Sequence, residues 1–199
     1  MENQVSSQPK IRVTADDYLE LERKAEVKSE YLNGEIVPMP GVTREHNLIS
    51  LNIATELRVQ LADRPCEVYG IDMRVKVSPT GLYTYPDIVA VCGEPKFEQR
   101  NVDSLLNPYL IVEVLSDSTE SYDRGRKFAH YRTLDSLKEY LLVSQHECRV
   151  EQYLRQPDGK WLYTETTDPN SSLELASIAC RLSISRVYHR IDFDRSAAR

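Results

Sequence analysis

Apolar side chains recur at helical spacing along one long stretch of the chain, residues 44–63. An interval of four residues keeps such side chains on one face of a helix, where they can pack against a core. Pro65 follows closely and disfavours helical backbone in the residue before it. We therefore predict the longest helix of the chain over residues 44–63. Its apolar face would consist of Ile49, Ile53, Leu57 and Leu61.

The N-terminal part of the chain predicts a capped helix and a tight hairpin. Thr14 begins the helix, and Asp17, three residues later, completes a capping box with it. Asn33-Gly34 lies between two apolar pairs. This dipeptide favours a type I′ turn, which needs positive φ at both central residues. We expect two short strands joined by this turn.

Further apolar stretches predict the elements that follow the long helix. We expect a helix over residues 120–134 and a strand over residues 139–143. The order from the long helix onward is therefore helix, three strands, helix, strand, which is typical of an α/β protein. The three strands after the long helix would span residues 67–77, 82–92 and 109–115.

The C-terminal part predicts a hairpin and two less regular elements. Residues 149–154 and 161–166 flank Pro157-Asp158-Gly159-Lys160, which is a favourable turn sequence. Beyond this hairpin we expect a strand near residues 182–184 and a short helix over residues 187–191.

Length and hydropathy limit the classes of protein to which the chain can belong. Its 199 residues suit one domain with a real core. We place this domain at residues 11–193, with flexible tails at residues 1–10 and 194–199. No apolar run approaches the roughly eighteen residues of a membrane helix, and the polar residues 1–10 do not resemble a secretory signal. We expect a cytoplasmic protein that does not enter a membrane.

Charge and cysteine content restrict the chemistry. The net charge of −6 counts against nonspecific binding to a polyanion, because phosphate contacts need Lys and Arg. A role with nucleic acid must therefore depend on a local basic patch. No Cys-x-x-Cys pair exists, so zinc and redox motifs are unsupported. We expect buried free thiols in a reducing cytoplasm. The cysteines are Cys66, Cys92, Cys148 and Cys180.

Glu113 is a carboxylate within the apolar stretch Leu110-Ile-Val-Glu-Val-Leu115. Burial of a carboxylate costs several kcal/mol unless the group is paired or bound to a metal. A structural ion pair with Lys or Arg would explain Glu113 alone. Asp87 is a second unusual acid, because Pro86-Asp87 directly precedes four apolar residues. A turn that begins a strand would explain Asp87 alone.

The two acids together indicate a metal site. If their strands are neighbours, Asp87 and Glu113 could face one another on the same side of a sheet. Two unpaired carboxylates at close range repel, and one would be pushed toward protonation. A divalent cation removes this conflict, and Mg²⁺ takes one or two carboxylates together with waters.

A third feature follows the Glu113 strand. Asp123, Lys127 and Tyr131 are spaced by four residues and so lie on one helical face. A surface ion pair between Asp123 and Lys127 would be worth only about 0.3–0.5 kcal/mol. Alternatively, Lys127 lies over the carboxylate pair, where it could orient water or stabilise charge on a phosphoryl group. Arg124, Arg126 and Arg132 give this region a local positive charge. These arginines either contact nucleic acid or form a solvated basic end of the helix.

His46 lies near the start of the long helix, in line with Ile49 and Ile53. A lone histidine there is more often a hydrogen-bonded structural group. A supporting role beside the metal site is the alternative.

These residues resemble the Uma-two family, which is catalogued as a group of candidate restriction endonucleases within the PD-(D/E)XK nuclease superfamily. The resemblance covers about residues 14–190, and the order and spacing of its elements are more specific than any single one. The shared elements are Asn33-Gly34-Glu35, His46, Pro86-Asp87, Glu113-Val-Leu-Ser116, Thr119, Asp123, Lys127, Tyr131 and Glu139-Tyr140.

The resemblance implies a restriction-endonuclease-like core with a mixed central sheet, an extra N-terminal hairpin and extra C-terminal strands. It implies Asp87 and Glu113 as the metal-binding acids, with the carbonyl of Val114 completing the site. The superfamily pattern places a lysine two residues after the acid, where this chain has Leu115. In this family the lysine comes from the next helix, which matches Lys127.

Three functions are compatible with these features. The first is a Mg²⁺- or Mn²⁺-dependent endonuclease acting on DNA, with Asp87, Glu113 and Lys127 as catalytic residues supported by Tyr131 and His46. The second is a nucleic-acid-binding module that kept the fold but lost turnover, as the acidic charge and Leu115 would suggest. The third is an interaction protein in which Glu113 is only a structural ion-pair partner. A homodimer is one assembly that we consider for each.

Overall fold

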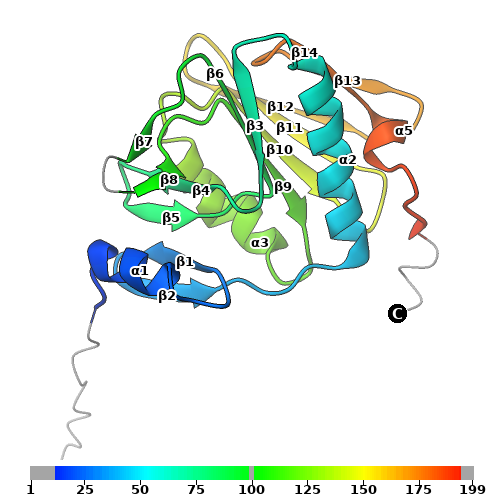
Figure 1. The fold of residues 1–199 in the computed structure, drawn as a ribbon. Helices are drawn as coiled ribbons and strands as arrows, with labels where there is room; N and C mark the ends of the chain where they lie inside the picture. The colour runs from blue at the N-terminus through cyan, green and yellow to red at the C-terminus, as the bar shows by residue number, and fades with distance from the viewer. Residues whose placement is uncertain (1–11, 99–100, 194–199) are drawn as a thin grey trace, which may run out of the picture.

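The structure of the chain is a computed structural model that describes residues 12–98 and 101–193, with the backbone alone at residues 101–103. Figure 1 shows a sheet at the centre, the strands of a second sheet beside it, and the N-terminal hairpin beneath both. The predicted flexible tails, residues 1–10 and 194–199, lie outside the described residues.

The central sheet has six strands and is mixed, because β9 and β10 are parallel whereas every other neighbouring pair is antiparallel. In spatial order its strands are β12 (Trp161–Thr166), β11 (Val150–Arg155), β10 (Glu139–Ser144), β9 (Leu110–Leu115), β6 (Ile88–Cys92) and β3 (Cys66–Gly70).

Helix α2 (Arg44–Gln60) covers one face of this sheet and is the longest described helix. Its predicted apolar face is confirmed, since Ile49, Ile53 and Leu57 are fully buried against strands of the sheet. A two-stranded hairpin and a short helix complete this layer. They are β13 (Ser172–Leu175), β14 (Cys180–Ser183) and α5 (Ile184–Val187).

The opposite face of the sheet is covered by one helical segment in three parts, which follows β9 and leads into β10. This segment supplies the crossover that two adjacent parallel strands require. Its side chain Tyr131 packs with Ile111, Leu115 and Tyr140 in a second core cluster. The parts are α3 (Glu120–Tyr122), the π-helix η1 (Asp123–Lys127) and α4 (Phe128–Tyr131).

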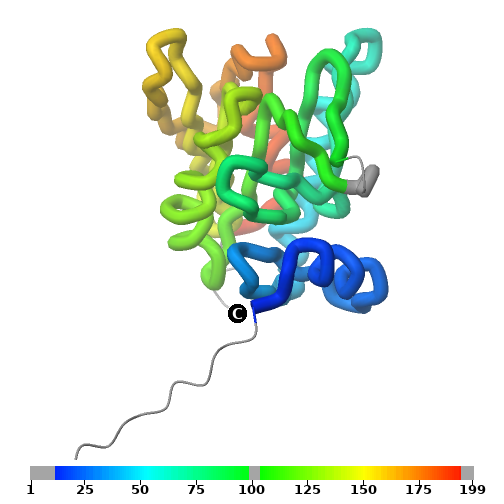
Figure 2. The backbone as a smooth tube through the Cα atoms, turned by 90° about the vertical axis from the view of Figure 1, so that its left-hand side faces the viewer, coloured from blue at the N-terminus to red at the C-terminus, as the bar shows by residue number. Residues whose placement is uncertain are grey.

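The second six-stranded sheet joins the N-terminal hairpin to strands from the middle of the chain. In spatial order it contains β2 (Glu35–Pro38), β1 (Ser29–Leu32), β5 (Leu82–Thr84), β4 (Arg74–Val77), β8 (Asn101–Leu105) and β7 (Phe97–Glu98). Helix α1 (Ala15–Glu22) packs on this sheet through Tyr18, whose ring stacks on Tyr31 at a centroid distance of 4.9 Å. Figure 2 shows from a second direction that this N-terminal segment lies beneath the rest of the molecule.

Both N-terminal predictions are confirmed. Thr14 and Asp17 form a capping box at the start of α1. Asn33 and Gly34 have φ values of 50° and 91°, as a type I′ turn requires.

The order helix, three strands, helix, strand is confirmed for the central sheet, but the predicted strands 67–77 and 82–92 are each two strands. The first divides at residues 71–73 into β3 and β4, and the second divides at residues 85–87 into β5 and β6. In both cases the chain changes sheet at the break. Strands β7 and β8 lie between the predicted strands 82–92 and 109–115, where we predicted neither a helix nor a strand. The strand predicted near 182–184 corresponds to β14 and begins earlier, at 180. The position predicted for the short helix, 187–191, is wrong, because α5 spans residues 184–187.

Two of the cysteines are not free thiols, contrary to our expectation. Cys66 and Cys92 are directly opposite each other in the β3–β6 pair and form a disulfide. The sequence could not reveal this pairing, because it depends on the register of two strands. Cys148 and Cys180 are free. Within residues 12–98 and 101–193, no helix has the length and apolar character needed to cross a membrane.

Candidate functional site

Side-chain alternation along β9 decides where Glu113 points. Val112 and Val114 belong to the core cluster beneath α2, whereas Ile111 and Leu115 belong to the cluster beneath the α3–α4 segment. Successive strand residues point to opposite faces. The Glu113 side chain therefore lies on the α3–α4 face, where the π-helix can reach it.

Asp87 lies where the pairing of β6 with β9 ends, one residue before Ile88, which is opposite Val112. Its Oδ2 accepts a hydrogen bond of 2.7 Å from the backbone N–H of Val114. The Asp87 carboxylate thus takes the place of a strand partner for β9. Since the N–H and carbonyl of one strand residue point to the same side, the Val114 carbonyl also faces the Asp87 side of β9.

His46 contacts the other oxygen of Asp87. Its Nε2 lies 2.7 Å from Asp87 Oδ1, and both side chains are buried. The backbone N–H of His46 donates a hydrogen bond to Thr43 Oγ1. The Thr43 hydroxyl in turn donates a 2.6 Å hydrogen bond to Gln145 Oε1. His46 Nδ1 is buried and has no hydrogen-bond partner among the described residues. The start of α2 is thereby fixed against Asp87.

The Lys127 ammonium lies among three carboxylates. Its Nζ is 3.0 Å from Glu113 Oε1, 3.0 Å from Glu30 Oε1 and 3.3 Å from Asp123 Oδ1. All four side chains are largely buried. Lys127 and Asp123 are the two ends of the π-helix η1, and π-bulges occur frequently at functional sites. Of the two alternatives for Lys127, the surface ion pair with Asp123 is wrong, because Lys127 is buried against Glu113 as well.

This cluster has an excess of negative charge over positive charge. Burial raises the pKa of Glu113 well above its ordinary value; Lys127 opposes this rise, and Asp123 and Asp87 add to it. Burial alone would lower the pKa of Lys127, but the neighbouring carboxylates, Glu113 first, raise it well above the usual range. The neighbouring carboxylates therefore favour the ammonium form of Lys127, whereas burial disfavours the ionised form of Glu113.

Tyr131 holds Glu113 from the end of α4. Its hydroxyl donates a 2.8 Å hydrogen bond to Glu113 Oε1 and lies 3.3 Å from Thr84 Oγ1. Thr84 in turn donates to Glu30. Burial raises the pKa of Tyr131 well above the usual range, so its hydroxyl stays protonated and acts as a donor.

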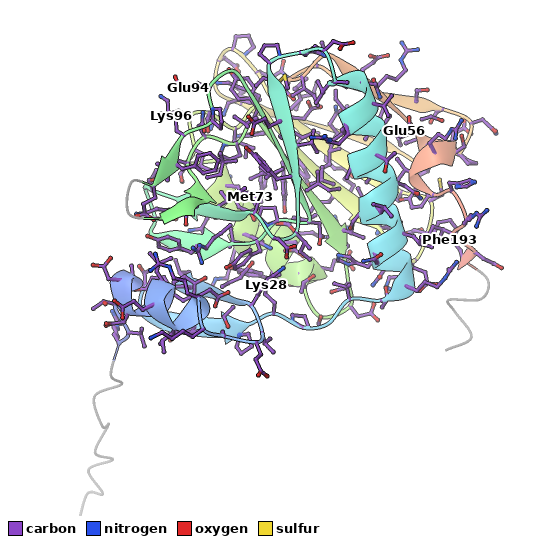
Figure 3. The ribbon with its side chains drawn as sticks, viewed as in Figure 1. Lys28, Glu56, Met73, Glu94, Lys96 and Phe193 are labelled. Atoms are coloured by element: carbon purple, nitrogen blue, oxygen red, sulfur yellow. A yellow bond between two sulfur atoms is a disulfide. The ribbon has the colours of Figure 1, made fainter. Side chains whose placement is uncertain are left out.

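A single cavity of about 670 Å³ contains this cluster. Asp87, Glu113, Lys127 and His46 line one part of it, and the segment from Val37 to Val42 lines another. Figure 3 shows Lys28 between the hairpin and the overlying sheets, where its ammonium reaches the Ile71 carbonyl and the Asp72 carboxylate. The cavity thus lies between the hairpin, the start of α2 and the end of β9.

The three arginines that we predicted as nucleic-acid contacts differ in their surroundings. Arg124 is paired with Glu120 and Glu151, and these partners raise its pKa. Arg132 is exposed and does not line the cavity. Arg126 is exposed and lines the cavity. Only Arg126 of the three is placed to approach a ligand bound there.

Glu30 is a member of the cluster that we did not predict. It comes from β1, and its carboxylate contacts Lys127 and Thr84. The one signal in the sequence is that Glu30 directly precedes the apolar pair Tyr31-Leu32. Nothing local connects it with Lys127, because their proximity depends on how the hairpin joins the second sheet.

The oxygen groups of the site fit a divalent cation. Asp87 and Glu113 offer carboxylates, Val114 offers a carbonyl on the same side, and the surplus negative charge needs compensation. Mg²⁺ prefers such oxygen ligands and keeps several waters. Among the described residues, no three His, Cys, Asp or Glu side chains are arranged to hold one ion together. A Mg²⁺ site of two carboxylates does not need a third.

Comparisons with known proteins place the chain in a family. Residues 15–185 match the model of the Uma2 family, whose description is "Putative restriction endonuclease". The chain is 39% identical over 164 residues to the "Uncharacterized protein sll1609" of Synechocystis sp., an alignment covering 82% of this chain and 93% of the relative. It is 33% identical over 187 residues to the "Uncharacterized protein slr1290" of the same organism, covering 94% and 97%.

A solved structure shares the fold. The crystal structure of a "putative nuclease belonging to DUF820" from Anabaena variabilis superposes with a TM-score of 0.73 at 21% identity, covering 88% of this chain and 97% of that one. The fold therefore belongs to the restriction-endonuclease-like α/β class, as predicted. The chain itself belongs to the Uma2 family.

Proposed function

We propose that the chain is a Mg²⁺-dependent endonuclease that hydrolyses phosphodiester bonds in DNA. The observation that carries this proposal is the convergence of Asp87, Glu113 and Lys127, from three separate parts of the chain, on one cavity. Membership of a family described as restriction endonucleases and the fold shared with a nuclease support the same function.

In this proposal Asp87, Glu113 and the Val114 carbonyl hold the cation, and Mn²⁺ can replace Mg²⁺. The bound ion would polarise a phosphoryl oxygen and make a coordinated water more acidic. The surplus of carboxylates around Lys127 favours binding of such a cation. Binding would also favour the ionised form of Glu113, whose pKa burial holds high without the ion.

Lys127 acts as a hydrogen-bond donor rather than a base, because its raised pKa keeps it protonated. Its ammonium would orient the attacking water or stabilise negative charge on the phosphoryl oxygens. In the reaction a P–O bond forms with the water oxygen and one ester P–O bond breaks. The proton lost by the water goes to solvent or substrate, and the leaving oxygen is protonated.

Two further side chains position the acids. The buried His46 is hydrogen-bonded to Asp87, and the Tyr131 hydroxyl donates to Glu113. Both contacts fix a carboxylate in one orientation, and small displacements at a reacting centre cost large factors in rate.

The test is cleavage of plasmid DNA in the presence of Mg²⁺, by the wild type and by Asp87→Ala, Glu113→Ala and Lys127→Ala, all purified identically. Each substitution should reduce cleavage by at least about a hundredfold. The exposed Asp158→Asn and Lys160→Ala serve as controls that should retain wild-type activity. Equal cleavage by the wild type and the triple variant would identify a contaminating nuclease and reject the proposal.

A second function, a nucleic-acid-binding module without turnover, is favoured by Leu115 at the position of the superfamily lysine. It predicts salt-dependent binding of DNA with no cleavage in Mg²⁺ or Mn²⁺. The plasmid assay and a binding measurement on the same samples separate the two functions.

A further inference from the structure

The acids and the lysine of the site lie deep in the cavity. Asp87, Glu113 and Lys127 are only 6%, 3% and 5% exposed. A phosphate must therefore enter the cavity to meet them. In a duplex each phosphate is fixed beside stacked, paired bases on a stiff rod, whereas an unpaired strand can bend inward and splay its bases.

One wall of the cavity is apolar and partly open to solvent. It is formed by the segment 37–42, here called the apolar wall, whose Val37 and Val42 are 59% and 47% exposed. The Met39 N–H donates a 2.8 Å hydrogen bond to the Lys28 carbonyl, which fixes the segment to the hairpin. A nucleobase has two flat apolar faces that a duplex hides by stacking and an unpaired strand exposes.

The charge of the cavity is unfavourable for a duplex. Among the described residues that line it, six carboxylates face two cationic side chains, Arg126 and Lys127. Duplex binding without base contacts depends on several Lys and Arg contacts along both backbones. Two cations are enough for one or two phosphates of a single strand. The carboxylates are Glu30, Glu35, Asp87, Glu113, Asp117 and Asp123.

We propose that the substrate enters the site as an unpaired DNA strand, with one nucleobase against the apolar wall and the adjacent phosphate at Asp87 and Glu113. The cavity volume of about 670 Å³ is within the range that accepts one small-molecule-sized group. This inference rests on the proposed nuclease function and names its substrate class. Arg126, at the exposed side of the cavity, contacts a neighbouring phosphate of the same strand.

The experiment compares cleavage of a circular single-stranded DNA with that of the same sequence as a relaxed, covalently closed duplex. The single-stranded circle should be cut at least about tenfold faster. Val37→Asp and Val42→Asp, which place a carboxylate on the apolar wall, should each lower single-strand cleavage by about tenfold.

Val59→Asp is the matched control, because Val59 is 72% exposed on α2 and does not line the cavity. Figure 3 shows the neighbouring Glu56 on the part of α2 far from the hairpin. Circular dichroism of each variant verifies that the fold is kept.

Three results are distinguishable. Preferred cleavage of the single strand, weakened by the Asp variants of the wall, supports the inference. Equal or faster cleavage of the duplex, or wall variants that cut the single strand like the wild type, overturns the inference and leaves the nuclease function standing. No cleavage of either DNA overturns the nuclease function and this inference with it.

Discussion

At the scale of single residues, the site is built around a charge imbalance. Three carboxylates surround the Lys127 ammonium, and the hydrogen bond from Tyr131 to Glu113 adds only a neutral donor. Removing one partner of a buried charged group is strongly unfavourable, because the remaining charge is left uncompensated. Hydrogen bonds from Tyr131 to Glu113 and from Thr84 to Glu30 stabilise two of these acids, and the proposed cation would offset more of the negative charge.

Glu30 should control the position of Lys127. Glu30→Gln removes one of the three ionic partners, so we expect the ammonium to shift and the rate constant for cleavage to fall about tenfold or more. The affinity for DNA should not fall, because Glu30 contacts the lysine rather than the phosphate and its removal takes a negative charge from the cavity. Single-turnover kinetics with a parallel binding titration measures both quantities.

The exposed Glu20→Gln on α1 is the control for the loss of one carboxylate. Thr84→Val, which removes the hydrogen bond to Glu30, should reproduce part of the effect. A Glu30→Gln variant with an unchanged rate constant would show that Lys127 does not depend on Glu30.

At the scale of elements, the site depends on where the chain passes from one sheet to the other. Residues 85–87 connect β5 to β6, and this passage places Thr84 beside Tyr131 and Asp87 beside Val114. The hairpin of β1 and β2 then brings Glu30 to the same place. A change in the hairpin should therefore affect the site as well as local stability.

Gly34 should be required for this hairpin. Its φ of 91° is strained for any residue with a Cβ, and an added Cβ would lie 2.7 Å from the Cβ of Arg12. We expect Gly34→Ala to lower the free energy of unfolding by at least about 1 kcal/mol. Gly70→Ala, where an added Cβ meets nothing within 4 Å and φ is not positive, is the control. Urea unfolding of the wild type and both variants measures these free energies. A Gly34→Ala variant as stable as Gly70→Ala would contradict the turn geometry.

Glu139, which lies outside the candidate site, should make the stability of the fold depend on pH. It is fully buried at the start of β10 and accepts hydrogen bonds from Gln152 and Ser177. Burial raises its pKa above the ordinary 4.5, although these hydrogen bonds oppose the rise. The folded chain therefore holds a proton that the unfolded chain releases, so this group favours folding less as pH rises from about 4.5.

The measurement is the difference in unfolding free energy between wild type and Glu139→Gln, taken from pH 4.5 upward. As pH rises, the unfolding free energy of the wild type should fall relative to that of Glu139→Gln. A difference that is flat, or that moves in favour of the wild type, would mean that the hydrogen bonds outweigh burial.

Much of the site was predictable from the sequence, and the remainder has a physical reason for being hidden. Asp87 and Glu113 are conspicuous because carboxylates are rare within apolar strands, and Lys127 follows Asp123 at helical spacing. Glu30 gives no such signal, because it reaches Lys127 only through the contact of β1 with β5, which pairs Tyr31 with Tyr83.

The helices and strands also divide into those that local patterns predict and those that depend on non-local contacts. The long helix and both predicted hairpins follow from local patterns. The division of strands 67–77 and 82–92 between two sheets does not, because each half is apolar enough to extend the other. The Cys66–Cys92 disulfide depends on the register of β3 with β6, which is equally non-local.

At the scale of the whole molecule, two sheets, a hairpin and two helical layers close around one acidic cavity. The net charge of −6 opposes an extended contact with a polyanion. Arg126 and Lys127 line the same cavity as Asp87 and Glu113, the acids proposed to bind a metal ion. An enzyme of this design would bind nucleic acid locally and would depend strongly on its divalent ion.

Asp87 and Glu113 are proposed to share one cation beside Lys127, and calorimetric titration with Mn²⁺ measures whether both acids contribute to its binding. The wild type should bind the ion, and Asp87→Asn and Glu113→Gln should each weaken binding by at least about tenfold. Lys127→Met should bind at least as tightly as the wild type, because it removes a competing positive charge. Binding of Mn²⁺ by Asp87→Asn and Glu113→Gln that equals binding by the wild type would contradict the account.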